Sequence, residues 1–121
     1  MKPQDHLADS TVKTSFHRTS SVIEQAANVL HQAAPDATII LFGSQARGDA
    51  GPESDCDFLL IEPEVQSRRK EMARLSRLLR PLRIPADVLV YSRQIFDEWS
   101  QIPGTVIHEA VREGKVLYAA P

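Results

Sequence analysis

The sequence predicts an α/β domain in which a small mixed β-sheet is flanked by helices. Three observations support this fold class. Helical and strand-like hydrophobic patterns alternate along the chain in the order α-β-β-α-β-α-α, which favours helices packed on a sheet. The length of 121 residues suits one domain with one core. Hydrophobic residues make up 42% of the chain and charged residues 25%, as in ordinary globular proteins.

The first part of the chain is polar. Residues 1–18 show no hydrophobic periodicity, so we interpret them as a mobile arm or a short extra segment, followed by a single domain over residues 19–121. Hydrophobic residues then recur at helical spacing. Ser21 and Glu24 fit a capping box at the start of this helix, and Pro35 is expected to stop it.

Two strands follow, with a glycine-rich segment between them. Residues 37–42 read ATIILF, which is too short and too β-branched for a helix and predicts a buried strand. Gly43 ends this strand, and residues 44–47 can form one helical turn. Residues 49–54 have a loop composition, and residues 55–61 are predicted to form the second strand.

A long basic helix is predicted next, over residues 64–82. Its face opposite the hydrophobic stripe is solvated in most proteins with such a pattern. The alternative is a docking surface for an acidic partner or for RNA. Seven of the fourteen Lys and Arg residues lie in this helix or just beyond it: Arg68, Arg69, Lys70, Arg74, Arg77, Arg80 and Arg83.

The remaining elements are short. Residues 86–91 read ADVLVY and predict the third strand, and residues 92–100 predict a short helix. A further helix is expected from residue 104 or 105 to 113, with Gly114 as its left-handed C-terminal residue. Residues 115–118 are expected to be extended.

Composition excludes several classes of function. The charge balance is 14 − 16 = −2, so direct nucleic-acid binding is not expected. Cys56 is the single cysteine, which rules out an internal disulfide, and there is no Cys/His cluster for zinc. The first residues lack the hydrophobic stretch of a signal peptide, and no hydrophobic run reaches the ~20 residues that span a membrane. We therefore expect a cytoplasmic protein with no membrane partner.

Three aspartates suggest a metal site. Asp55 and Asp57 point to the same face of the predicted second strand because side chains alternate along a strand. Carboxylates so close repel each other unless a cation lies between them, and Mg²⁺ is the natural cation for such oxygen ligands. Asp87 is a third carboxylate at the start of another strand. On its own, Asp87 is equally well explained as a strand-end residue that caps a loop.

A candidate phosphate site lies at the end of the first strand. Gly43 allows a phosphate to approach the backbone, and the free N–H groups of the following turn can bind it together with the Ser44 hydroxyl. The sequence has no P-loop motif, no dinucleotide-binding glycine pattern and no EF-hand.

These residues also carry a family resemblance. Gly43-Ser44, ten residues and then Asp55-x-Asp57 resemble the signature of the DNA polymerase β-type nucleotidyltransferase superfamily. The segment GSQARGDAGPESDCD is similar to the minimal nucleotidyltransferases of prokaryotes, which read G-S-x-A-R-G followed by S-D-x-D. The similarity extends over about residues 21–118.

The resemblance implies roles for these residues. Gly43 and Ser44 would hold the β- and γ-phosphates of ATP. Asp55 and Asp57 would bind two Mg²⁺ ions, and Asp87 would complete the catalytic metal site and accept the proton of the attacking hydroxyl. AMP would be transferred and pyrophosphate would leave.

Arg47 has two possible roles under this resemblance. It would brace the loop by pairing with an acidic side chain, which we favour, or reach the phosphates of the nucleotide.

The resemblance also implies a partner. Similar minimal nucleotidyltransferases are paired with a small helical HEPN RNase toxin and act as its antitoxin by binding it and by transferring AMP to a tyrosine. In the sequence itself, the hydrophobic C-terminal helices around Trp99, Ile102 and Ile107 are the candidate surface for such a partner. The alternatives are transfer to a small-molecule acceptor and a non-catalytic antitoxin that keeps the fold.

Overall fold

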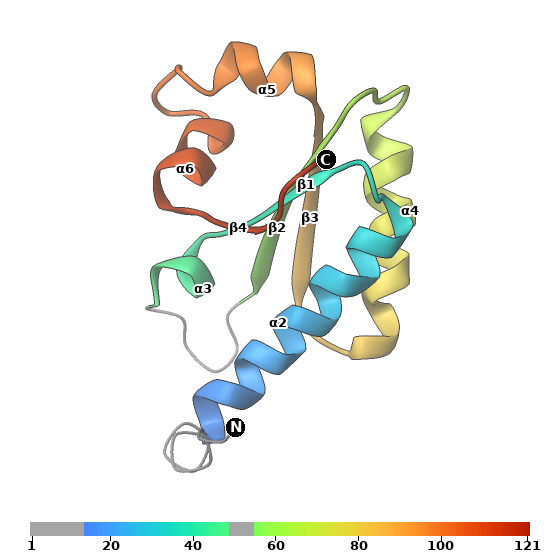
Figure 1. Cartoon of the computed structure of the whole chain (residues 1–121), viewed down its shortest axis with the longest axis vertical. Helices are drawn as coiled ribbons and strands as arrows, with labels where there is room; N and C mark the ends of the chain where they lie inside the picture. Colours follow the sequence, from blue (N-terminus) through green and yellow to red (C-terminus); the bar gives the residue numbers. More distant parts are fainter. Residues whose placement is uncertain (1–13, 49–54) are drawn as a thin grey trace.

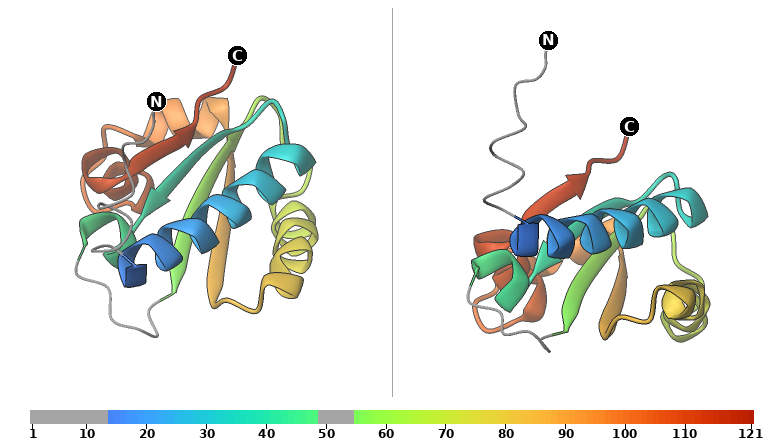
Figure 2. Two further views of the ribbon diagram at one scale, coloured as in Figure 1. Left: turned by 60° about the horizontal axis from the view of Figure 1, so that its bottom comes forward. Right: turned by 90° about the horizontal axis from the view of Figure 1, so that it is seen from below.

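In the computed structural model, residues 14–48 and 55–121 are described, without the side chains of residues 14–20. These residues form a four-stranded sheet with helices on both faces (Figures 1 and 2), which confirms the predicted α/β fold with a small mixed sheet. The strands are β1 (Thr38–Phe42), β2 (Cys56–Glu62), β3 (Ala86–Ser92) and β4 (Lys115–Tyr118). The α-helices are α2 (Thr14–Ala33), α3 (Ser44–Arg47), α4 (Arg68–Leu79), α5 (Arg93–Trp99) and α6 (Val106–Glu113), and a 3₁₀ turn, η1 (Arg80–Leu82), follows α4.

The sheet has the order β3-β2-β1-β4, so β3 and β4 are its edge strands. β2 and β3 are parallel, whereas β1 runs antiparallel to both of its neighbours. Phe42, at the end of β1, lies opposite Asp57, and Asp57 lies opposite Asp87. The end of β1 and the starts of β2 and β3 therefore meet at one end of the sheet.

The core has two layers because side chains alternate along each strand. One face of the sheet packs against α2 and α4 through residues such as Phe58 and Leu60, which are fully buried. The other face packs against α6 and α5 through residues such as Leu59 and Phe42. Cys56 is buried on the α2 and α4 side. Asp57 is the next residue along β2, so its side chain points to the opposite face of the sheet, on the α6 side.

The first helix is longer than predicted. α2 begins at Thr14, seven residues before the expected start at Ser21, so residues 14–18 of the expected arm are helical. Polar residues extend a helix readily once a packed segment has nucleated it, and hydrophobic periodicity does not report them. The rest of the expected arm lies outside the described residues.

The basic helix begins later than predicted. The side chain of Ser67 accepts a hydrogen bond from the Lys70 N–H group and caps α4, so residues 64–67 stay outside the helix. The 3₁₀ turn η1 then continues α4 to Leu82, and Arg83 adopts a left-handed conformation with φ 56°.

The sequence predicted Gly114 as a left-handed residue at the end of α6, and this prediction is wrong. Gly114 has φ −80° and ψ 166°, so it is not left-handed. A Cβ atom at this position would overlap the carbonyl oxygen of Ala110 and the side chain of Ile40. Glycine is therefore required here by the close approach of α6 to β1.

We expect Gly114→Ala to destabilise the fold by about 1–3 kcal/mol, because the added methyl group overpacks this contact without straining the backbone. The free energy of unfolding in urea measures the effect. Lys115→Ala, at an exposed neighbour, should change stability by less than about 0.5 kcal/mol. Equal stability of the two variants would contradict the close approach.

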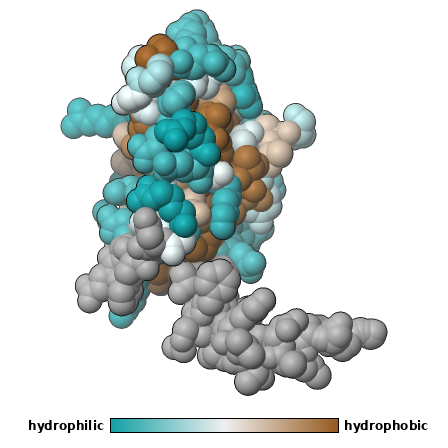
Figure 3. All heavy atoms as spheres, turned by 90° about the vertical axis from the view of Figure 1, so that its left-hand side faces the viewer, coloured by the Kyte–Doolittle hydropathy of each residue, from teal (hydrophilic) through white to brown (hydrophobic). Residues whose placement is uncertain are grey.

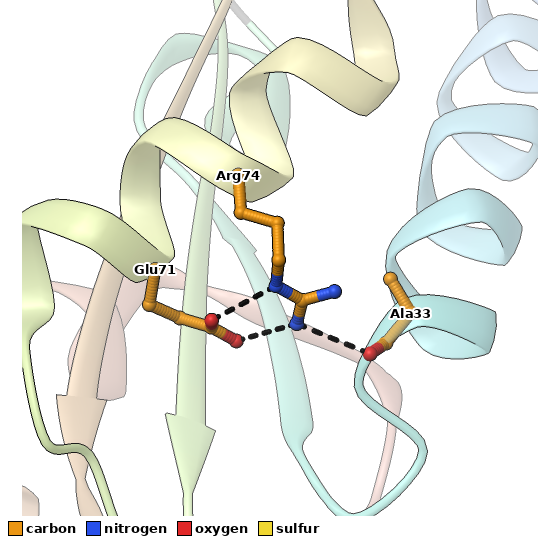
Figure 4. A network of polar contacts seen from close by, with 3 residues as sticks. All are labelled: Ala33, Glu71 and Arg74. Atoms are coloured by element: carbon orange, nitrogen blue, oxygen red, sulfur yellow. Dashed lines mark hydrogen bonds and ion pairs between the residues drawn. The ribbon is translucent and has the colours of Figure 1, made fainter.

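A polar network ties α4 to the end of α2. The Arg74 guanidinium pairs with both carboxylate oxygens of Glu71, at 3.0 and 2.7 Å, and donates to the carbonyl oxygen of Ala33 at 3.2 Å (Figure 4). Burial and the contact with Glu71 raise the pKa of the nearby Glu62 to about 7, although Arg74 opposes the shift. The hydrogen bonds from Arg74 hold the pKa of Glu71 below its usual value.

The raised pKa of Glu62 predicts how the stability of the fold depends on pH. Its pKa in the folded protein is above the unfolded value of 4.5, so between about pH 4.5 and 7 the folded state binds more protons than the unfolded state. Stability contributed by protonated Glu62 should therefore fall as pH rises through this range, by about 1 kcal/mol after solvent screening. Glu62→Gln should remove this part of the pH dependence of the melting temperature, and the exposed Glu64→Gln should keep it.

No helix among the described residues is long and apolar enough to cross a membrane.

Candidate active site

A sharp bend follows β1. Gly43 has φ 77° and ψ −157°, a conformation that side-chain-bearing residues rarely adopt. It precedes α3, whose first hydrogen bond runs from the Arg47 N–H group to the Gly43 carbonyl oxygen at 3.0 Å. Gly48, with φ 86°, ends the turn. The backbone N–H groups at the start of such a turn have no partner within it and are suited to bind an anion.

Two carboxylates lie beside this bend. Asp57 and Asp87 occupy paired positions of the parallel strands β2 and β3, so their side chains emerge next to each other on one face. A Cβ atom built at Gly43 would overlap Oδ2 of Asp57. The bend is therefore in direct contact with the carboxylate, and glycine is required for the contact as well as for the backbone angle.

The charges around Asp57 do not balance. Burial raises the pKa of Asp57, and the nearby carboxylates of Asp87, Asp55 and Glu109 raise it further. Arg47 is the cation that opposes the shift. A site that holds several carboxylates close together favours a bound cation, because a cation removes both the repulsion and part of the cost of burial.

An open cleft of about 760 Å³ covers the bend and the carboxylates. Gly43, Ser44, Arg47, Asp57 and Asp87 all line it, so the structure brings five of the six predicted site residues together. The sixth, Asp55, immediately precedes β2, is exposed and does not line the cleft. Asp55 is nevertheless close enough to raise the pKa values of Asp57 and Cys56.

Arg47 braces the bend. Its Nη1 atom lies 3.2 Å from a carboxylate oxygen of Glu113 and 3.8 Å from one of Glu109, both on α6. Arg47 thus links the turn after β1 to a helix more than sixty residues later in the chain. Arg47 also lines the cleft, so the residue that pairs with α6 is at the same time part of the site.

Sequence reasoning missed part of the cleft. Val106 and Glu109 line it from α6, and α4 contributes four residues: Arg69, Met72, Ala73 and Ser76. Only the packing of α4 beside β3 brings these residues near Asp87, and no local pattern reports that packing. The basic face of residues 68–83 was the one signal that pointed to Arg69.

The donor set fits a divalent cation with a phosphate ligand. The described residues contain no group of three or more His, Cys, Asp and Glu side chains arranged to hold a metal by themselves. Mg²⁺ commonly binds one or two carboxylates and takes its remaining ligands from substrate phosphates and water. The pair of Asp57 and Asp87 beside a turn that is suited to bind an anion meets that requirement.

The comparison with protein families decides the identity. The family model described as "Nucleotidyltransferase domain" matches residues 23–115, which include the bend, both strands that carry the aspartates and α6. The chain belongs to the nucleotidyltransferase domain family. The resemblance inferred from the glycine and aspartate motif is therefore confirmed at the level of the family.

Solved structures have the same fold as this nucleotidyltransferase. A chain in a crystal structure of a toxin–antitoxin with AMP-PNP aligns with a TM-score of 0.58 and 20% identity, over 80% of this chain and 73% of that one. A candidate nucleotidyltransferase from Sulfolobus solfataricus aligns with a TM-score of 0.58 and 19% identity, over 98% of this chain and 91% of that one. No curated protein matches the sequence. These identities show a shared fold.

Proposed function

We propose that this nucleotidyltransferase transfers AMP from ATP to a hydroxyl group of a protein partner, a tyrosine of a small helical HEPN-type toxin, and so acts as the antitoxin of the pair. The observation that carries the proposal is the Gly43–Ser44 bend beside the paired carboxylates of Asp57 and Asp87 in one open cleft. That arrangement suits a triphosphate next to a group that can accept a proton.

The chemistry is an in-line displacement. The acceptor oxygen attacks the α-phosphorus of ATP, the bond from the α-phosphorus to the bridging oxygen of the β-phosphate breaks, and pyrophosphate leaves. Ser44 and the N–H groups at the start of α3 bind the β- and γ-phosphates and so orient the leaving group. Asp87 accepts the proton that the acceptor hydroxyl loses.

Asp57 and Asp87 would hold the divalent ions, with Asp55 able to join them from the segment just before β2. Bound Mg²⁺ would supply charge stabilisation for the entering and leaving oxygens. Arg47, held by Glu109 and Glu113, fixes the turn so that its N–H groups keep their direction during the reaction.

Exposed hydrophobic residues support a protein partner. Trp99, Ile102 and Val111 are 41%, 46% and 49% exposed. Figure 3 shows the α6 side of the molecule, where hydrophobic surface lies between hydrophilic side chains. Ile107, in contrast, is fully buried and does not face outward as the sequence suggested. One structural relative is described as a toxin–antitoxin with AMP-PNP, which is consistent with a toxin as partner and a nucleotide as substrate.

The test is the intact mass of the partner. The chain is co-expressed with the product of the neighbouring reading frame, and any complex is purified and incubated with ATP, with and without Mg²⁺. We expect the partner to gain one or more AMP units only when Mg²⁺ and ATP are both present. A partner of unchanged mass would contradict protein AMP transfer.

Radiolabelled ATP distinguishes the alternatives. With the α-phosphate labelled, transfer to a small molecule would place the label in the low-mass fraction. A non-catalytic antitoxin would form the complex and release no pyrophosphate.

A further inference from the structure

The cleft crosses the sheet from one element to the next. The Gly43 bend follows β1, Asp57 lies on β2 and Asp87 lies on β3, and the strand order places these three strands side by side. Beyond β3 the next element is α4, which lies along that side of the sheet in Figures 1 and 2. The part of the cleft between Asp87 and α4, which we call the extension, is therefore at the opposite end from the bend.

The extension is lined differently from the rest of the cleft. Leu89 and Met72 are half-buried there, and Ala73 is exposed. Ser76 and Arg69, one turn to either side of Ala73 along α4, supply its polar groups. Its remaining lining residues, on β3 and α4, are hydrophobic: Val88, Leu89, Met72 and Ala73. The extension therefore suits a hydrophobic group that carries a polar end toward Asp87.

The chemistry of the transfer determines what approaches from this end. In an in-line displacement the entering oxygen and the leaving pyrophosphate lie on opposite sides of the α-phosphorus. In the proposed function the pyrophosphate part of ATP is held at the Gly43 bend, and the α-phosphorus lies at Asp57 and Asp87. The entering hydroxyl then arrives from the extension. The ribose is attached through another oxygen of the α-phosphate, off this line, so the nucleoside does not fill the extension.

We propose that the extension binds the side chain of the acceptor residue and selects a tyrosine. The inference rests on the proposed AMP transfer and names the residues that hold the acceptor. The ring lies against Leu89, Met72 and Ala73, with its hydroxyl at Asp87. The phenolic oxygen forms a bond to the α-phosphorus, the bond to pyrophosphate breaks, and the phenolic proton passes to Asp87.

An aromatic ring fits this lining better than a short hydroxyl side chain does. A ring is stabilised when its surface leaves water, and a methionine thioether such as that of Met72 is a favourable neighbour for it. Serine and threonine carry the hydroxyl close to their backbone and would leave the hydrophobic lining in water. A neutral phenol is also compatible with the carboxylates of Asp57, Asp87 and Glu109, which line the same cleft.

The identity of the modified residue is the first test. Peptide mapping of the partner after the intact-mass experiment should find AMP on a tyrosine. AMP on a serine or threonine would overturn the selection of a ring and leave AMP transfer to a protein standing. A partner that gains no AMP would overturn the proposed function and the acceptor site with it.

Filling the extension tests its position. Because Ala73 is exposed, Ala73→Phe places a ring in the extension at little cost to folding. We expect the kcat/KM for the partner to fall about 10²-fold, because the acceptor hydroxyl is displaced from the α-phosphorus. The Kd of α,β-methylene-ATP, which cannot release pyrophosphate, should stay within about twofold when calorimetry measures its binding to the full chain alone.

Ala119→Phe is the matched control. Ala119 is exposed and follows β4 at the end of the sheet away from the bend, so this variant should change neither value. An unchanged kcat/KM in Ala73→Phe would overturn the proposal. A Kd for α,β-methylene-ATP raised about tenfold or more would place the nucleoside in the extension and overturn it as well.

A double-mutant cycle tests the contact itself. The complex with the partner is formed in the presence of α,β-methylene-ATP, so that no transfer occurs. Replacing the modified tyrosine with alanine should raise the Kd of the complex about tenfold, because one buried ring is lost. Combined with Ala73→Phe, this replacement should raise the Kd no further than Ala73→Phe alone. Additive effects, or no effect of the tyrosine replacement, would overturn the contact between the ring and the extension.

Discussion

Asp57→Asn should reduce AMP transfer to the partner on the order of 10³-fold and at the same time raise the melting temperature. Activity falls because the neutral amide binds a divalent cation more weakly than a carboxylate does and supplies no negative charge to hold it at the reacting phosphate. Stability rises because Asn removes a half-buried carboxylate whose pKa is raised by burial and by Asp87 and Asp55. A gain of about 2–5 °C corresponds to a relief of 0.5–1 kcal/mol in a domain of this size.

Opposite changes in activity and stability separate a functional residue from a structural one. The matched control is Asp97→Asn, which removes an exposed carboxylate on α5 that pairs with Arg93 at 3.5 Å. A surface pair of this kind contributes little, so both activity and melting temperature should stay close to those of the unmodified chain. Transfer by Asp57→Asn within tenfold of the unmodified chain would falsify the assignment of this carboxylate.

Gly43→Ala should abolish transfer and destabilise the fold by about 2–4 kcal/mol. Two costs combine: the positive φ of 77° disfavours any side chain, and the new methyl group would overlap Oδ2 of Asp57. To relieve the overlap, the bend has to move away from the carboxylate, and the phosphate site then loses its alignment with Asp57. Urea unfolding measures the first effect, and pyrophosphate release measures the second.

Gly104 provides the control for this substitution. It has φ 90°, and a Cβ atom there would meet nothing within 4 Å. Gly104→Ala therefore carries the backbone strain alone, which we expect to cost about 1–2 kcal/mol and to leave the transfer rate unchanged. If Gly43→Ala and Gly104→Ala lost the same stability and both kept the transfer rate of the unmodified chain, the close contact between the bend and Asp57 would not be needed for activity.

The fold was largely predictable because its strands are short, β-branched and bounded by Gly or Pro. Boundaries were less predictable where polar residues decide them. The start of α2 at Thr14 is not marked by hydrophobic residues, and the start of α4 depends on the Ser67 side chain. The conformation of Gly114 follows from its contact with Ile40, seventy-four residues earlier, which no local pattern contains.

The site was predictable where one short motif carries it. Gly43, Ser44 and Asp57 are close in the sequence and remain close in the structure. The position of Asp87 beside Asp57 depends on the pairing of β2 with β3, which local patterns do not determine. The alternation of side chains along a strand predicted equal roles for Asp55 and Asp57. In the structure β2 begins at Cys56, and of these two aspartates Asp57 lines the cleft and Asp55 does not. The catalytic and metal-binding roles of these residues stay predictions.

The bracing of α3 by α6 has a consequence for biosynthesis. Arg47 leaves the ribosome long before Glu109 and Glu113, and β1 gains its second neighbour, β4, later still. Such distant contacts form slowly because a long loop must close before they stabilise anything. A nascent chain that ends at β3 would hold the aspartates without a fixed turn. Nucleotide binding should therefore arise late in translation, when α6 has emerged.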